Sequence, residues 1–144
     1  MSLNLAIPLR EAIIANVAVS GQLAQWEGEP AVFTRLPVPA DAPYPFVLIS
    51  ADISMGDQDS LVTRRPLVRR DLLIYGLQPD HYRLVEDLGY LLRTQFHRQR
   101  FALSVPGYGV TDIVAQGPVV APTDSEQEVA RVVPLQVRLQ DLST

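Results

Sequence analysis

Residues 128 to 142, with the sequence EVARVVPLQVRLQDL, alternate between apolar and polar side chains over most of their length. Such a period of two places successive side chains on opposite faces of a β-strand. One face carries Val133, Leu135, Val137 and Leu139, and the other carries Gln136, Arg138 and Gln140. A strand with one apolar and one polar face is typical of an antiparallel sheet that is covered on one side. Pro134 lacks the N–H that a ladder needs, so we expect a sheet edge or a bulge at that residue.

Four further segments have the composition of strands: residues 31–36, 46–53, 67–77 and 110–115. Between the first two, residues 37–45 contain four prolines, which predicts a stiff extended connector. The segments 46–53 and 67–77 can pair as a hairpin around a long connection, about residues 54 to 66. Connections longer than about 12 residues are uncommon in compact domains and often carry function.

Two segments predict helices with one apolar side. In residues 79–99 the expected N-cap is Asp80, and the apolar stripe consists of Val85, Leu88, Leu92 and Phe96. In residues 3–26 the stripe consists of Leu5, Leu9, Ile13 and Val17. Ser20 and Gly21 break the pattern, and we expect a short second helix through Leu23 and Trp26. Together these elements predict an α+β fold with one domain over residues 1–144. We expect a single twisted antiparallel sheet, helices packed on one of its faces, and a long hairpin arm.

The composition excludes several kinds of site. The chain has no cysteine, which removes disulfides, thiol catalysis and cysteine-based zinc sites. The formal net charge of −4 argues against a general nucleic-acid binder. His81 and His97 would lie roughly 24 Å apart along one helix, so they cannot share a metal ion. No nucleophile elbow or phosphate loop is found, and we expect no catalytic residue, no cofactor, no metal and no enzyme activity.

Neither membrane insertion nor secretion is predicted. No apolar run approaches the roughly 18–20 residues that are needed to span a bilayer. The first ten residues, MSLNLAIPLR, carry no positive side chain before Arg10, unlike a secretory signal. We therefore expect a soluble intracellular product.

The stretch TRRPLVRRDLLIYGL, residues 63 to 77, contains Arg64, Arg65, Arg69 and Arg70. Four acidic residues accompany them: Asp52, Asp57, Asp59 and Asp71. The arm is therefore neutral but strongly patterned, which is the wrong balance for a phosphate-binding patch. Two interpretations stay open. The arm is a solvated hairpin with weak ion pairs, or it protrudes and docks on another copy, for which the planar fork of arginine is well suited.

A second charge asymmetry also bears on assembly. Arg93 and Arg98 lie in a stretch without acids, whereas residues 122–128 are acidic. Unlike, complementary patches suit head-to-tail contacts between copies. The alternative is that these arginines only complement the dipole at a helix C-terminus. The candidate subunit interface consists of Arg64, Arg65, Arg69, Arg70, Arg93, Arg98, Asp124, Glu126 and Glu128.

Nearly the whole chain resembles the tail terminator, or tail-completion, proteins of long-tailed bacteriophages and prophages. The likeness runs from the helix LREAIIANVAVSGQLA (9–24) through VFTRLPVPADAPYPFVLIS (32–50) and VRRDLLIYG (68–76). It continues through the amphipathic helix YRLVEDLGYLLRTQFHRQRF (82–101) to VARVVPLQVRL (129–139). The proline-linked YPFVLI and the succession of strand and helix are its most specific parts.

The resemblance implies a structural role without catalytic residues. Members of this family assemble at the head-proximal end of the tail tube, commonly as a hexameric ring. They stop tube polymerisation and offer a surface to head-completion proteins. It implies self-association and contacts with the tube and head-completion proteins, with no specific nucleic-acid sequence and no membrane. The protein would reside in the virion tail after assembly in the host cytoplasm. Two alternatives remain: a non-viral protein-interaction module of the same fold, and a small hydrolase with dispersed catalytic residues.

Overall fold

The computed structural model describes residues 6–18, 23, 25–26, 28–34, 43–50, 54–57, 65–77, 80–123 and 126–142. The helices are α1 (Ala6–Ala18), α2 (Tyr82–Phe96) and the short 3-10 helix η1 (Arg100–Ala102). The first strands are β1 (Gln25–Trp26), β2 (Glu29–Pro30), β3 (Val32–Phe33), β4 (Phe46–Ile49) and β5 (Ser54–Asp57). The later strands are β6 (Pro66–Leu77), β7 (Tyr108–Ala115), β8 (Val119–Val120) and β9 (Glu128–Asp141).

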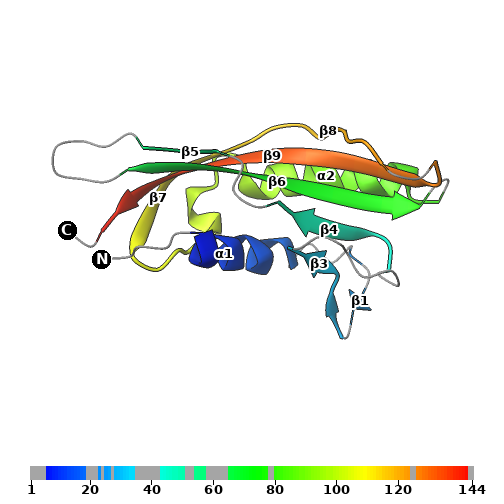
Figure 1. Cartoon of the computed structure of the whole chain (residues 1–144), viewed down its shortest axis with the longest axis horizontal. Coiled ribbons are helices and arrows are strands. Elements are labelled where there is room, and N and C mark those ends of the chain that lie inside the picture. Colours follow the sequence, from blue (N-terminus) through cyan, green and yellow to red (C-terminus); the bar gives the residue numbers. More distant parts are fainter. Residues whose placement is uncertain are drawn as a thin grey trace.

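Two long antiparallel strands, β6 and β9, form the centre of a seven-stranded sheet and run along the long axis of the molecule (Figure 1). The strand order is β3-β4-β6-β9-β7, with β5 also paired to β6 and β8 also paired to β9. The predicted α+β class and the predicted antiparallel pairing of the strands at 46–53 and 67–77 are confirmed. One pair, β3 with β4, is parallel, and β1 and β2 form a separate two-stranded sheet.

A line of interrupted pairing crosses the sheet at Asp71 and Pro134, which face each other in the β6–β9 ladder. On one side of β6, both β4 and β5 pair with it, and Ser50 lies between them opposite Asp71. The Ser50 N–H donates to the Asp71 carbonyl at 3.0 Å, and the Asp71 N–H donates to Ser50 Oγ at 2.8 Å. On the other side, β7 and β8 both pair with β9, and their connection passes Pro134. The line therefore divides the sheet into two halves.

Pro134 lies neither on an edge strand nor in a bulge, because β9 is central and its ladder with β6 is continuous there. Its carbonyl accepts a hydrogen bond of 3.1 Å from the Gln116 N–H, just beyond the end of β7. The N–H and C=O positions of one strand residue point toward the same neighbouring strand. The nitrogen of Pro134 therefore points to the gap between β7 and β8, where no strand residue would accept a hydrogen bond from it. The lack of an N–H at this position costs the sheet no hydrogen bond.

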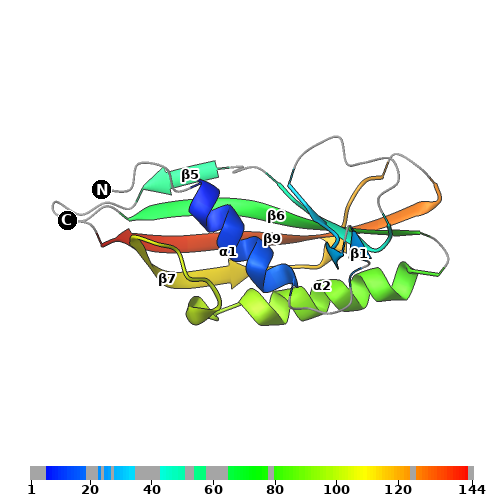
Figure 2. The same ribbon diagram turned by 90° about the horizontal axis from the view of Figure 1, so that it is seen from below.

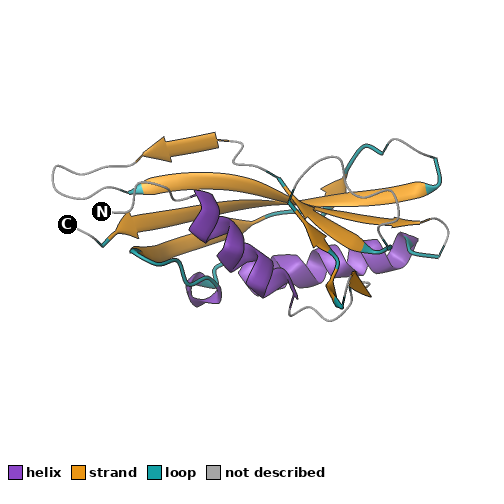
Figure 3. Ribbon diagram, turned by 60° about the horizontal axis from the view of Figure 1, so that its bottom comes forward, coloured by secondary structure: helices purple, strands orange, loops and turns teal. Residues whose placement is uncertain are grey.

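Helices α1 and α2 lie on one face of the sheet (Figures 2 and 3). The expected stripes are buried: Leu9, Ile13 and Val17 from α1, with Val85, Leu88, Leu92 and Phe96 from α2. They meet the inner sides of the central strands, including Val68, Leu72, Ile74, Val133, Leu135, Val137 and Leu139. The predicted covered face of residues 128–142 is therefore confirmed.

The described part of the first helix, Ala6–Ala18, lies within the predicted segment. The short second helix expected through Leu23 and Trp26 is wrong, because Gln25 and Trp26 form β1. The start of α2 also differs from the prediction. The N-cap of α2 is His81 and not Asp80, and its side chain makes no cap hydrogen bond. Instead the His81 imidazole accepts a hydrogen bond of 3.1 Å from the N–H of Leu77, so it joins the end of β6 to the start of the helix.

The opposite face of the sheet, which the two helices leave open, carries an aromatic cluster in the half that contains β4. Phe46 is the centre of this cluster, with ring centroids 5.4 Å from Phe33, 5.2 Å from Tyr44 and 5.1 Å from Tyr75. Phe46 and Ala31 are buried there. This half of the sheet is therefore apolar on both of its faces.

The predicted long arm is partly strand. Residues 54–57 form β5 and pair with residues 66–69 of β6, so the ladder continues beyond the predicted end of the hairpin. The remainder of the expected connection, residues 58–64, lies outside the described residues. The hairpin is an extension of the sheet because each residue of β5 adds a paired position beside the long central strand.

Candidate subunit interface

The adjacent arginines of β6 lie on opposite faces of the sheet, as the pleat of a strand requires. Arg70 belongs to the inner face and is 4% exposed, and its Nη1 donates a hydrogen bond of 2.9 Å to the Ser50 carbonyl. Arg69 points to the open face and forms an ion pair of 3.4 Å with Asp71. Arg70 therefore stabilises the junction between β4 and β5, whereas Arg69 remains partly accessible to a partner.

Arg65 is exposed at the start of β6, while Arg64 lies outside the described residues. With Arg138, Thr111 and Gln140, Arg65 lines a shallow hollow of about 290 Å³ on the sheet. A second, smaller hollow of about 90 Å³ lies beside Arg69. The outer face of the sheet half with β7 is thus a surface with two hollows that carries guanidinium and amide groups. Such a surface suits contact with a protein better than the enclosed binding of a small molecule.

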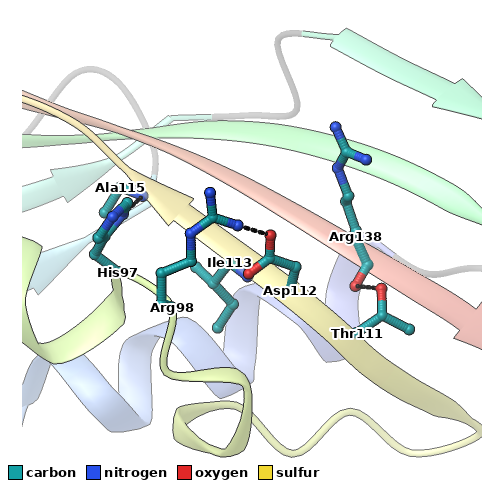
Figure 4. A network of polar contacts seen from close by, with 7 residues as sticks. All are labelled: His97, Arg98, Thr111, Asp112, Ile113, Ala115 and Arg138. Atoms are coloured by element: carbon teal, nitrogen blue, oxygen red, sulfur yellow. Dashed lines mark hydrogen bonds and ion pairs between the residues drawn. The ribbon is translucent and has the colours of Figure 1, made fainter.

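Arg98 already has a carboxylate partner in its own chain, Asp112 (Figure 4). Its backbone adopts a left-handed conformation with φ of 58°, which follows the end of α2 as the residue after a helix C-cap commonly does. The Arg98 N–H donates to the Ile113 carbonyl at 2.7 Å. Side chain and backbone together fasten the turn after α2 to β7.

The pairing of Arg98 depends on a bulge in β7. The register with β9 shifts between Val110 and Asp112, so Thr111 is the extra residue. The Thr111 hydroxyl donates a hydrogen bond of 3.1 Å to the Arg138 carbonyl (Figure 4). Because a bulge redirects the side chains beside it, Asp112 reaches the turn that carries Arg98. Sequence reasoning placed Arg98 in a stretch without acids, and the fold supplies the acid from the following strand.

Arg93 lies in the last turn of α2 and is half-buried. A cation at this position interacts favourably with the negative end of the helix dipole. This agrees with the alternative that the helix arginines complement a C-terminus, and it leaves a contact of Arg93 with another copy untested.

The described acidic candidates lie in the turn before β9 and at its first residue. Glu126 is exposed, Glu128 is half-buried, and Asp124 lies outside the described residues. The Tyr44 hydroxyl donates a hydrogen bond of 2.9 Å to Glu128. Burial, then this hydrogen bond and the negative charge of Glu128, raise the pKa of Tyr44 to about 12. Glu128 therefore joins the aromatic cluster to the acidic turn.

The acidic turn and the arm arginines lie at opposite ends of the central ladder. Glu128 is opposite Leu77, the last residue of β6, whereas Arg65 immediately precedes the first. Twelve residues of strand separate the two ends by roughly 35–40 Å. The separation that the sequence suggested along the chain is therefore also a separation in space.

Several exposed apolar side chains were not singled out as site residues from the sequence. Phe101, in η1, is 87% exposed, and Val120, in β8, is 76% exposed. Tyr82 and Tyr90 on α2 are about half exposed. Their residue types signal nothing on their own, because single exposed apolar residues are common and only the fold shows which ones stay uncovered.

Within the described part of the chain, no group of three or more His, Asp or Glu side chains is placed to hold a metal ion. The same residues include no helix that is long and apolar enough to cross a membrane. The candidate features in the described residues lie on the surface. They are the polar outer face of the sheet half with β7, the two charged ends of the central ladder, and a few exposed apolar side chains.

No protein-family model matches the chain, and no curated protein matches it. A solved structure does match: a chain described as "Virion of native gene transfer agent (GTA) particle", with a TM-score of 0.76 and 11% sequence identity. The alignment covers 96% of this chain and 99% of that chain. At this identity the comparison establishes a shared fold over almost the full length of both chains.

Proposed function

We propose that this protein is a structural, non-enzymatic component of a phage-like particle, and that it works there as a tail terminator. The observation that carries the proposal is the fold shared with a chain of a gene transfer agent virion, which extends over 96% of this chain and 99% of that one. The sequence resemblance to tail terminator proteins supports the same role independently. In this role one domain over residues 1–144 caps the head-proximal end of the tail tube.

Copies of the chain assemble head to tail into a ring, commonly a hexamer in proteins of this kind. The opposite placement of Arg65 and the acidic pair Glu126 and Glu128 supports this arrangement, since a ring needs two different complementary faces. Arg64 is next to Arg65 in the sequence and Asp124 is close to Glu126, so we include them in the same two complementary faces. Arg93 and Arg69 add positive charge toward the basic side. Arg70 is buried, so its role is to stabilise the fold and not to contact a neighbouring copy.

The ring presents one rim to the tail tube protein and the other to a head-completion protein. Exposed ion pairs are each worth only about 0–1 kcal/mol, so apolar contacts must supply much of the affinity between copies. Charge chiefly selects which faces meet. The protein then resides in the virion tail after assembly in the host cytoplasm.

Deletion of the gene from a producing phage or prophage tests the role directly. We expect tails of uncontrolled length and heads without joined tails in electron micrographs, because nothing stops tube growth or offers the head-joining surface. A plasmid copy of the wild-type gene should restore both. Particles of normal tail length with heads attached would show that the chain has another role.

Charge reversal tests the proposed ring. The variant Arg65→Glu should remain folded but assemble more weakly, as measured by mass in solution. Arg83→Glu is the matched control, since Arg83 is almost fully exposed and pairs only loosely, at 3.9 Å, with Asp87. Wild-type assembly should also weaken toward 1 M salt, where the screening length falls to about 3 Å. Equal assembly of both variants would mean that charge does not select the interface.

A further inference from the structure

Phe101 is the most exposed of the large apolar side chains in the described residues, at 87%. It belongs to η1, the short turn that follows α2 (Figure 2). An aromatic ring of this size in water is unfavourable, and aromatic residues are enriched among the anchors of protein interfaces. Its position therefore raises the question of what covers it.

The turn that carries Phe101 is held firmly in place. The Ala102 N–H donates to the Gln99 carbonyl at 2.8 Å, and the Ala102 carbonyl accepts a hydrogen bond of 3.1 Å from the side chain of Asn16 in α1. The Arg100 guanidinium lies 4.7 Å from the centroid of the Phe101 ring. A ring presented on such a braced turn loses little conformational entropy when it is buried by a partner.

A hollow that could receive an aromatic ring lies at the other end of α2. It has a volume of about 260 Å³, and Tyr82, Val120, Glu128, Val129 and Arg131 are among its lining residues. Val120 is 76% exposed at this hollow, so an apolar side chain there also lacks a cover.

The two features are also complementary in charge. Arg100 lies beside the Phe101 ring. Glu128 lines the hollow, and Glu126 lies nearby in the preceding turn. Glu128 already accepts a hydrogen bond from the Tyr44 hydroxyl, but a carboxylate has two oxygens that accept several hydrogen bonds. The cation of Arg131 in the same hollow is already engaged: it lies over the Tyr82 ring and donates to the Ala130 carbonyl. The arginine–aromatic pair therefore matches a hollow that is lined by both apolar side chains and a carboxylate.

One molecule cannot make this contact with itself, because the 15 residues of α2 hold the two features roughly 22 Å apart. We propose that Phe101 of one copy occupies the Tyr82–Val120 hollow of a second copy, with Arg100 facing Glu128. The contact is heterologous, so repetition of it produces a ring or a filament. It deepens the proposed ring by naming the apolar contact between neighbouring copies, and in that respect it rests on the proposed function.

Two variants remove the two sides of the contact separately. Phe101→Ala removes the inserted ring but keeps the hollow, and Val120→Asp spoils the hollow but keeps the ring. Both residues are exposed, so folding should be unaffected by either change. Each variant should raise the dissociation constant of self-association roughly 30-fold or more, as loss of an aromatic anchor does. Tyr90→Ala is the matched control, and it should assemble like the wild type.

Mixing the two variants gives the sharpest result. The intact hollow of Phe101→Ala can accept the intact ring of Val120→Asp, but neither chain can continue the assembly. An equimolar mixture should therefore stop at a heterodimer in native mass measurements. A wild type that stays monomeric at its highest soluble concentration, single variants that assemble like the wild type, or a mixture without heterodimer would each overturn the proposal.

A cysteine pair provides a second measurement, since the chain has no cysteine of its own. The double variant Gln99→Cys and Pro122→Cys places exposed thiols beside the contact and keeps Phe101 and Val120. It should form disulfide-linked multimers on oxidation, whereas Gln99→Cys with Tyr90→Cys should not. Equal cross-linking of both pairs would contradict the contact. These tests concern only how isolated copies meet, so their failure leaves the virion role intact. A gene deletion without effect on tails would instead remove the virion role and leave the contact standing.

Discussion

The two halves of the sheet on either side of Asp71 and Pro134 share two long strands and differ in how many faces they bury. In the half with β4, Phe46, Leu48 and Ala130 are buried on the face away from the helices. In the half with β7, the same face carries exposed Gln136 and Arg138. Both halves contribute to one continuous core on the helix side. The comparison shows that the central strands contribute to the core on the helix side in both halves, whereas their outer face is buried by packing in one half and exposed in the other.

The largest expected effect separates these two outer faces. Phe46→Ala should lower the free energy of unfolding by about 3–5 kcal/mol, because it removes the centre of the aromatic cluster and leaves a cavity. Gln136→Ala, at an exposed position of the other half, should change it by less than about 0.5 kcal/mol. Urea unfolding of both variants measures the difference. Similar losses would show that the two outer faces are equivalent.

The neighbouring arginines at the dividing line sharpen the comparison between the two faces. Arg70→Ala should cost about 1.5–3 kcal/mol, because it removes a buried, charged donor to the Ser50 carbonyl. Arg69→Ala removes only a partly exposed ion pair with Asp71, so it should cost no more than about 1 kcal/mol. Thermal unfolding at neutral pH distinguishes them. If Arg69→Ala proves the more damaging change, the outer face contributes more to folding than its exposure suggests.

A glycine tests how tightly α2 packs against the half that contains β8. A Cβ atom at Gly89 would approach Pro118 Cβ to 2.6 Å. Gly89→Ala should therefore cost about 1–3 kcal/mol in overpacking, against a gain of about 1 kcal/mol in helix propensity. We expect a net loss of about 1 kcal/mol in chemical unfolding. Thr94→Ala, at an exposed position of the same helix, controls for the change in helix propensity. If Gly89→Ala instead stabilises the protein, the segment at Pro118 moves away to make room for the added methyl group.

The smallest expected effect is the pH dependence that Tyr44 contributes in the aromatic half. Its pKa is raised from 10.0 to about 12 in the folded chain, so the unfolded chain releases this proton first. Stability is therefore fully present below pH 10 and falls as the pH rises from 10 toward 12. Tyr44→Phe should flatten the fall in melting temperature over that window relative to Tyr90→Phe, whose ring is half exposed. Identical slopes would show that folding does not raise the pKa of Tyr44.

The sequence predicted the fold class, the long half-buried strand and the stripe of α2 because these depend on periodicity, which is local. It predicted the separation of basic and acidic ends for a similar reason, since the two charge groups flank different elements. It did not predict the partner of Arg98, which the bulge at Thr111 brings from the next strand. It also did not predict which of two adjacent arginines is buried, although alternation requires that they face opposite ways.

By itself the sequence determined which residues alternate, and therefore which sets share a face of a strand or helix. Only the tertiary structure decided which face the helices cover and where the sheet is interrupted. It also decided that Phe101 and Val120 stay exposed at opposite ends of α2. The physical reason is that exposure and pairing depend on contacts between segments far apart in the chain. A pattern of residue types fixes the side on which a residue lies, and the packed chain alone fixes what it meets there.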